Sequence, residues 1–222
     1  MILNNPIKVP CRDMESETSE DGFRIYTTPD GVRMPSITSV LKDYNKKAIE
    51  DWKERVGEEE AARVLHVAGW RGSAVHEALE NYLLGKPYET DNYPVMRRFS
   101  QIKEVLEGNM TEWNSLEVSL YSDMLGVAGQ SDLVGVFQDQ RSIIDFKTAR
   151  KRKKKAWIHS YFLQCAFYAF AYYERTGIFI PQLVVIVANA QGGPDVFVEK
   201  LEDWLPKLVK YIAEWKDAHD IS

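Results

Sequence analysis

The spacing of apolar positions predicts helices in the first half of the chain. Residues 46 to 66 and 69 to 84 read as two helices, and the second carries an apolar stripe that stops at Gly85-Lys86-Pro87. A further helix is predicted over 93 to 107. Before these, Ser36 and Thr38 are candidate caps for a short helix that ends near Tyr44.

The spacing then changes to the alternation that is typical of strands. Three strands are predicted over 113 to 121, 126 to 137 and 142 to 147. A helix over 157 to 176 and a buried strand over 183 to 188 follow. The remaining predicted elements are a hairpin around Pro29-Asp30-Gly31, a short strand over 196 to 198 and a last helix over 204 to 218. We therefore expect an α/β fold in which helices flank one small mixed sheet.

The same pattern predicts a single domain. Residues 1 to 22 show no periodicity and many charges, so we expect a loose N-terminal arm. Residues 23 to 222 would form the domain, with a helical wall or arch over 23 to 110 and the core over 111 to 222.

Composition excludes several classes of protein. The chain has 222 residues, of which 45% are hydrophobic and 27% charged, which is typical of a globular protein. Two cysteines are too few for a disulfide framework or a four-thiolate metal site. No apolar run approaches the roughly 20 residues of a membrane helix, so no membrane partner is expected. The acidic N-terminus is unlike a signal or transit peptide, so we expect a protein that is not secreted.

The candidate chemistry begins with an acidic residue two positions before a lysine. This pair occurs at Asp51-Trp-Lys53, Asp145-Phe-Lys147 and Glu214-Trp-Lys216. The first and last lie in predicted helices, where a solvated pair is the simpler interpretation. Asp145 and Lys147 instead end a predicted strand and share one of its faces.

The predicted hairpins bring further carboxylates to that face. If Asp139-Gln140 is a two-residue turn, Asp132 lies opposite Lys147, diagonal to Asp145. If Asp123-Met124 is the preceding turn, Glu117 lies opposite Gln130 on the same face. Carboxylates that converge in this way are suited to a divalent cation.

Four short stretches in this order resemble one family. They are Gly72-Ser-Ala-Val-His76-Glu-Ala-Leu, Gly129-Gln-Ser-Asp132, Asp145-Phe-Lys147-Thr148 and Gln164-Cys-Ala-Phe-Tyr168. Together they resemble the RecB-like branch of the PD-(D/E)XK nucleases, and within it the group of mitochondrial genome maintenance and phage exonucleases. The segment Met34-Pro-Ser-Ile-Thr-Ser-Val-Leu41 is also similar to that group, and the resemblance covers about residues 34 to 200. It implies a restriction-endonuclease-like core.

The resemblance also implies roles for individual residues. Asp132 and Asp145 match the acids that bind Mg²⁺ or Mn²⁺, with the Phe146 carbonyl and His76 as further ligands. Lys147 matches the lysine that orients or deprotonates the attacking water, and Glu117 matches an acidic position less closely. Gln164 and Tyr168 match residues that support the site or the DNA. Their spacing alone favours a buried tyrosine bonded to an amide as much as a substrate contact.

Residues 150 to 155 are six consecutive basic residues directly after the candidate strand. Such a run is usually a solvated loop, but its position favours phosphate binding by Arg150, Lys151 and Arg152. Thr148, Ser36 and Arg71 are further candidates for substrate contact. The net charge is −5, so the chain outside this run carries −11, and the distribution of charge favours DNA where its sum does not.

We therefore expect a metal-dependent deoxyribonuclease that acts on DNA with single-stranded ends, in the cytoplasm of a bacterial or phage-infected cell. The resemblance implies a 5′-phosphate product. An endonuclease of the same superfamily and a catalytically silent DNA-binding subunit of a recombination complex are the alternatives.

Overall fold

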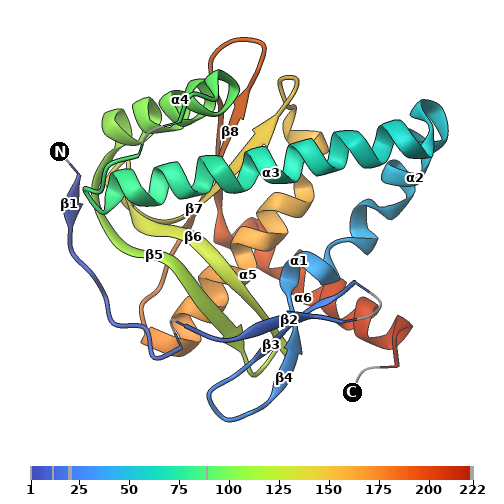
Figure 1. Ribbon diagram of the computed structural model, residues 1–222. Helices are drawn as coiled ribbons and strands as arrows, with labels where there is room; N and C mark the ends of the chain where they lie inside the picture. Colours follow the sequence, from blue (N-terminus) through green and yellow to red (C-terminus); the bar gives the residue numbers. More distant parts are fainter. Residues whose placement is uncertain (1, 12, 20–21, 89, 221–222) are drawn as a thin grey trace.

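A computed structural model describes residues 2–11, 13–19, 22–88 and 90–220 (Figure 1). The strands are β1 (Leu3–Asn4), β2 (Ser16–Thr18), β3 (Arg24–Thr27), β4 (Arg33–Pro35), β5 (Met110–Ser122), β6 (Val127–Phe137), β7 (Gln140–Ala149), β8 (Gln182–Asn189) and β9 (Asp195–Lys200). The α-helices are α1 (Ile37–Val40), α2 (Lys46–Val56), α3 (Glu58–Leu83), α4 (Tyr93–Asn109), α5 (His159–Thr176) and α6 (Leu201–Ala218). Two short 3₁₀-helices are η1 (Asp43–Asn45) and η2 (Lys155–Trp157). In the part of the chain that is described, no helix has the length and apolar character that a bilayer crossing requires.

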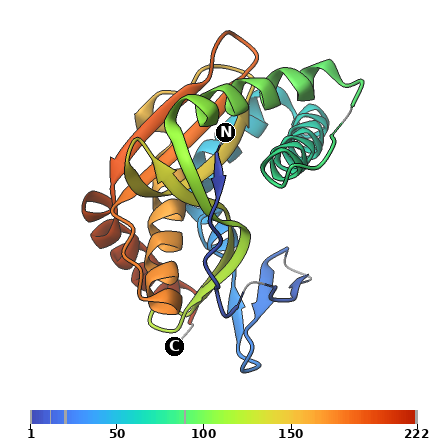
Figure 2. The same ribbon diagram turned by 90° about the vertical axis from the view of Figure 1, so that its left-hand side faces the viewer.

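Six strands form one mixed sheet in the order β1-β5-β6-β7-β8-β9. β5, β6 and β7 are antiparallel neighbours, whereas β7 and β8 are parallel and are connected through α5. Figure 2 shows α3 on one side of this sheet and α5 and α6 on the other. This confirms the expected α/β fold, a mixed sheet flanked by helices with a restriction-endonuclease-like core.

Two apolar clusters hold these layers together. One joins α3 and α4 to one face of the sheet, and its centre includes Leu79, Ile102, Leu133 and Phe146. The other joins α5, α6 and the N-terminal strands to the rest of the sheet. Burial of apolar side chains on both faces is why the central strands read as nearly continuous hydrophobic runs.

The N-terminal segment is more ordered than the expected loose arm. β1 pairs with β5, and β2 joins β3 and β4 in a three-stranded sheet. Val9 and Cys11 are buried, because the segment between these strands packs on the outer part of β5. This part of the segment is packed rather than loose, while residues 1, 12, 20 and 21 lie outside the described residues. The division of the domain at residue 110 stays a prediction.

The helices differ from the predicted ones in two places. The break expected between residues 66 and 69 lies at Gly57 instead, where the backbone has a φ of +88°. Glycine adopts this conformation without a steric penalty, so Gly57 ends α2 and α3 continues unbroken to Leu83. The short helix after Ser36 ends at Val40 rather than near Tyr44.

α3 is therefore much longer than predicted, and its first part has little support from the rest of the protein. Between Ala61 and Val75 it buries no side chain, and α2 buries none at all. Figure 1 shows α2 and the outer end of α3 projecting past the large sheet. We refer to α2 and residues 58–70 of α3 as the helical arm.

Both predicted hairpins are present, but each register is shifted by two residues. The turn between β6 and β7 is Gln138-Asp139, with φ values of +50° and +62°, as a type I′ turn requires. Four residues, rather than two, connect Ser122 to its partner Val127. A shift of two keeps every side chain on its predicted face, so the predicted grouping of carboxylates survives.

Candidate active site

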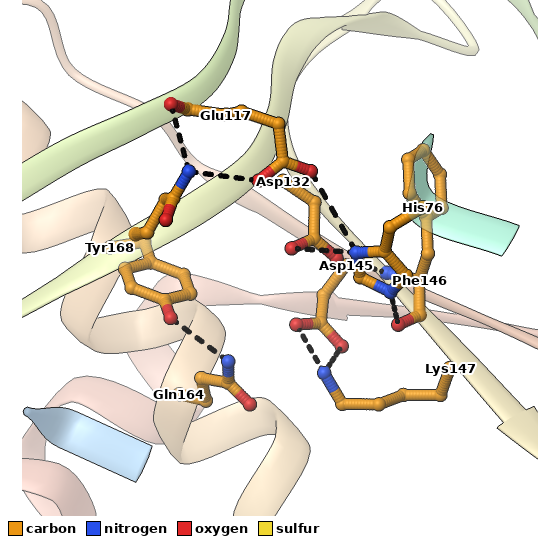
Figure 3. Close-up of polar contacts among 9 residues, drawn as sticks. His76, Glu117, Asp132, Asp145, Phe146, Lys147, Gln164 and Tyr168 are labelled. Atoms are coloured by element: carbon orange, nitrogen blue, oxygen red, sulfur yellow. Dashed lines mark hydrogen bonds and ion pairs between the residues drawn. The ribbon is translucent and has the colours of Figure 1, made fainter. Parts of the chain in front are cut away.

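A cavity of about 460 Å³ lies where α3, the central strands and α5 meet the three-stranded sheet. We call it the site cavity. It is lined by Arg24, Tyr26, Thr38, Gly72, Ser73, His76, Glu77, Glu80, Glu117, Gly129, Gln130, Asp132, Lys147, Gln164 and Tyr168. Figure 3 shows that the sequence-predicted His76, Glu117, Asp132, Asp145 and Lys147 all lie together.

His76 is placed by the packing of α3. Val75 and Leu79, on its apolar stripe, are buried against the sheet, which leaves His76 at the edge of the buried face. Its Nε2 atom lies 3.0 Å from the Phe146 carbonyl oxygen. Its Nδ1 atom lies 3.5 Å from Asp132 Oδ1 and 3.7 Å from Glu117 Oε1. The histidine thus reaches the residues that follow Asp145 and both carboxylates of the neighbouring strands.

Asp132 and Glu117 each accept hydrogen bonds from a neighbouring strand. The Phe146 amide donates a 2.7 Å hydrogen bond to Asp132 Oδ2. Gln130 Nε2 donates to the Glu117 carbonyl and to Glu117 Oε2, at 3.2 and 3.0 Å. Glu117 has a φ of +46°, which is unusual for a residue other than glycine and recurs at active sites.

These side chains fit a divalent cation. One ligand atom from each of His76, Glu117 and Asp132 lies within 4.8 Å of the other two. Carboxylate oxygens suit Mg²⁺ and Mn²⁺, and an imidazole nitrogen is a further metal ligand. The Phe146 carbonyl lies at the other nitrogen, Nε2, of the same imidazole. Asp145, which the sequence placed among the ligands, is outside this group and is bonded to Lys147 instead.

The charges of the cluster depend on one another. Burial lowers the pKa of His76, but the carboxylates of Asp132 and Glu117 outweigh burial and raise that pKa to about 9. Burial raises the pKa of Asp132, against the opposing charges of His76 and Lys147. At neutral pH these carboxylates therefore favour the protonated form of His76.

Asp145 and Lys147 form a tight ion pair on β7. Lys147 Nζ lies 2.6 Å from Asp145 Oδ1, and the side chain of Asp145 is only 1% exposed. Burial raises the pKa of Asp145 to about 6 although Lys147 opposes it. Burial acts to lower the pKa of Lys147, but Asp145 and Asp132 raise it well above its usual value. Lys147 is therefore a permanent cation in this state.

Gln164 and Tyr168 lie one turn apart on α5, at the floor of the site cavity. Gln164 Nε2 donates a 2.9 Å hydrogen bond to the Tyr168 hydroxyl, so the amide–tyrosine pair anticipated from their spacing is present. Both residues also line the site cavity. Gly129 permits this arrangement, because a Cβ there would lie 3.0 Å from the Tyr168 ring and from Ile37.

The sequence that forms this site matches a family model. Residues 39–182 match the model described as the PD-(D/E)XK nuclease superfamily, which is more than half of the chain. The chain belongs to the PD-(D/E)XK nuclease superfamily. The match includes His76, Glu117, Asp132, Asp145 and Lys147.

Two individual proteins resemble this nuclease. It is 27% identical to the human protein "Mitochondrial genome maintenance exonuclease 1" over 210 residues, which cover 83% of this chain and 60% of that protein. The nuclease thus spans less than two thirds of the length of this relative. A solved structure from Eubacterium rectale with a provisional exonuclease assignment has 15% identity, a TM-score of 0.39, and coverage of 67% of this chain and 68% of its own.

Three of the residues considered for substrate contact lie outside the lining of the site cavity. Ser36 is buried and caps α1, accepting a 3.0 Å hydrogen bond from the Ser39 amide. Thr148 lies beside α3, where a Cβ at Gly72 would approach its hydroxyl to 4.0 Å. Arg71 is half-buried, and burial lowers its pKa. The structure does not place these three among the side chains that line the site cavity.

The six basic residues 150–155, which we call the basic loop, are partly neutralised. Arg152 binds Asp195 of β9 at 2.5 Å, and the Lys153 amide donates to the same carboxylate at 2.9 Å. Lys155 binds Glu199 at 2.5 Å. Arg150 and Lys151 are exposed. The loop is therefore held to β9 by two acids, while its first two basic residues face solvent.

Some residues near the site come from elements that the sequence pattern does not place there. Arg24 and Tyr26 reach the site cavity from the three-stranded sheet, a placement that no local pattern could reveal. Tyr161 of α5 lies with its ring centroid 5.3 Å from Lys147 Nζ. Glu80 lies one helical turn after His76, so the spacing puts both on one helix face, and the structure shows that both line the site cavity.

Proposed function

We propose that this protein is a metal-dependent deoxyribonuclease that removes nucleotides from single-stranded DNA ends. The observation that carries this proposal is the cluster of His76, Glu117 and Asp132 beside the Asp145–Lys147 pair. The superfamily match supports a nuclease, and the exonuclease among its relatives supports action at ends.

The residues divide into metal ligands and positioning groups. His76, Glu117, Asp132 and the Phe146 carbonyl would hold Mg²⁺ or Mn²⁺, with Asp145 next to them. The bound ion would polarise the scissile phosphate and stabilise its developing charge. Lys147 is held as a cation by Asp145, so it is suited to donate a hydrogen bond that orients the attacking water. Gln164 and Tyr168 would support the floor on which the DNA rests.

The exonuclease proposal is tested with linear and circular DNA. Linear strands labelled at the 5′ or the 3′ end, and closed single-stranded circles, are incubated with Mg²⁺ or with EDTA. We expect metal-dependent loss of nucleotides from linear DNA and none from circles, and we expect Asp145→Ala to be inactive. Cutting of circles would favour the endonuclease alternative. DNA binding without any cleavage would favour the silent subunit, and cleavage in EDTA would contradict the metal-dependent mechanism.

The basic loop should supply part of the DNA affinity through Lys151. Each phosphate contact on single-stranded DNA contributes about 0.7 to the slope of log affinity against log salt. We expect Lys151→Ala to lower the magnitude of this slope by about 0.7. Lys155→Ala is the matched control, because Lys155 is already bound to Glu199 and its loss should leave the slope nearly unchanged. Equal slopes for both variants in a fluorescence anisotropy titration would contradict the assignment.

Metal binding should depend on pH in a defined direction. Metal coordination needs neutral His76, whose metal-free pKa is about 9, so binding releases a proton below that pH. We expect the apparent Mn²⁺ affinity to rise by about tenfold per pH unit between pH 7 and 9. The stability of the protein without metal should instead fall over this pH range. A histidine whose pKa is raised by folding stabilises the fold below its unfolded pKa near 6.5, and this contribution is lost as the pH rises through the folded pKa of about 9.

Thermal unfolding with and without Mn²⁺ over this range measures both trends. His76→Gln is the control, and its metal response should be weak and independent of pH. A wild-type metal response that does not change with pH would contradict the role of His76 as a ligand.

A further inference from the structure

A second cavity of about 210 Å³ adjoins the site cavity. We call it the side cavity. Thr38 and Gln164 line both cavities, so the two are neighbours across these side chains. The residue that caps α1, together with η1, α2 and the start of α5, supplies the other walls of the side cavity, with Leu41, Asn45, Ile49 and Tyr161 among them. Nothing in the proposed metal site uses these four residues.

We propose that the side cavity binds one nucleobase of the DNA strand whose phosphate lies in the site cavity. This proposal rests on the proposed nuclease function and extends it to a subsite. Whole drug-sized ligands occupy roughly 300–1,000 Å³, so a cavity of about 210 Å³ suits a single flat ring system better than a complete nucleotide.

The walls match the two surfaces of a base. Leu41 and Ile49 are apolar and Tyr161 is aromatic, which suits the faces of a base. Asn45 donates a 3.0 Å hydrogen bond to the Ser160 hydroxyl, so an amide and a hydroxyl line the same cavity for the polar edge of a base. These groups suit stacking with little sequence preference, as expected for a nuclease that must accept every base in turn.

The charges around the two cavities favour a base over a metal ion as the occupant of the side cavity. Among the described residues that line the side cavity, none has a carboxylate, so a metal ion is not its occupant. Lys42 also lines it and is exposed; its ammonium group donates a 2.6 Å hydrogen bond to the Gly22 carbonyl and supplies positive charge for a neighbouring phosphate. The site cavity, in contrast, is lined by Glu77, Glu80 and Glu117. A strand with a phosphate near Lys147 would therefore place its base away from these acids.

Tyr161 joins the side cavity to the proposed chemistry. Its ring lines the side cavity, and the same ring lies 5.3 Å from Lys147 Nζ. A base stacked on Tyr161 would hold this ring, and through it the lysine, in one position. Filling of the side cavity should therefore affect the cleavage rate as well as DNA affinity.

The test combines a protein variant with removal of single bases. Ile49 is 40% exposed, so Ile49→Glu should fold normally while it places a carboxylate at the side cavity. Val56→Glu is the matched control, since Val56 is 37% exposed and lies seven residues further along the same helix face. The substrates are single-stranded oligonucleotides with one abasic nucleotide, placed at each position in turn near the end. Single-turnover cleavage and equilibrium binding are measured for each, and thermal unfolding verifies the fold.

We expect Ile49→Glu to lower kcat/KM on intact DNA on the order of tenfold, a loss typical for a single stacked base, and Val56→Glu to stay within about twofold of wild type. One abasic position should slow the wild type to a similar extent, and on that substrate Ile49→Glu should cause no further loss. Additive losses, or no sensitive abasic position, would overturn the subsite. If no DNA is cleaved, the proposed nuclease function fails, and the binding data still decide whether the cavity holds a base.

Discussion

Asp132→Asn is expected to lower the rate of DNA cleavage by roughly 10²- to 10³-fold without unfolding the protein. Asp132 lies between the Phe146 amide and His76, and asparagine can keep the hydrogen bond from that amide. What it removes is the negative charge that faces His76 and the proposed metal ion. The loss should appear in the single-turnover rate, because a charge that stabilises the transition state acts on the chemical step.

The same substitution should raise the thermal stability of the metal-free protein. Burial raises the pKa of Asp132, which shows that the ionised carboxylate is less stable here than in water. A neutral side chain of the same shape removes that cost, whereas it also removes the stabilisation that Mn²⁺ gives the wild type. Unfolding temperatures with and without Mn²⁺ measure both effects.

Asp139→Asn is the control for Asp132→Asn. Asp139 is exposed in the turn between β6 and β7, and asparagine accepts its φ of +62°. It should leave both the rate and the metal response unchanged. An Asp132→Asn protein that is folded and retains more than a tenth of the wild-type rate would contradict the assignment of Asp132 to the site.

Lys147→Met is expected to lower the cleavage rate by roughly 10²- to 10⁴-fold and also to destabilise the fold. Asp145 is 1% exposed, and its ion-pair partner is Lys147. Removal of one member of a buried ion pair costs about 3–5 kcal/mol when the other stays charged. Activity and stability should therefore fall together in this variant, in contrast to Asp132→Asn.

The loss of stability in Lys147→Met should depend on pH. The pKa of Asp145 is raised to about 6 in the wild type, and loss of Lys147 should raise it further. A raised carboxyl pKa stabilises the fold at low pH, and this contribution is lost as pH rises through the folded pKa. The variant should thus be closer to wild-type stability at pH 5 than at pH 8, as measured by urea unfolding.

A double variant separates the two effects of Lys147. Asp145→Asn with Lys147→Met leaves no buried charge at this position, so we expect it to be more stable than Lys147→Met alone but equally inactive. Lys155→Met is the control. Lys155 forms an ion pair with Glu199, but its side chain is 54% exposed, and exposed ion pairs contribute little to stability. A double variant no more stable than the single one would contradict the account of Asp145.

The grouping of carboxylates on the sheet could be predicted because it depends only on alternation. The predicted turn before β7 lies one residue later in the sequence than the observed turn. Moving a two-residue turn by one position changes the partner of every residue in the hairpin by two positions. Asp132 therefore stays on the same face as Asp145. An error of one residue in the register would have separated them.

The contacts between distant elements could not be predicted in this way. His76 reaches Asp132 only because Val75 and Leu79 seat α3 on the sheet, and a helix pattern does not say where the helix packs. The hydrogen bond between Asp145 and Lys147 depends on side-chain direction and burial, which alternation along a strand does not give. The role of Tyr161 depends on the same lysine. In the three-stranded sheet, the hairpin of β3 and β4 is predicted from its Pro29-Asp30-Gly31 turn, whereas β2 is too short to show periodicity.

The unbroken length of α3 has a mechanical consequence. Its 26 residues make a rod of about 39 Å, with the helical arm at one end and His76 near the other. Val75 and Leu79 fix the second half of this rod to the sheet, so the arm is carried by the same rigid element that positions the imidazole of His76. The rod therefore sets the distance between the arm and the cluster, although the arm itself packs on little else.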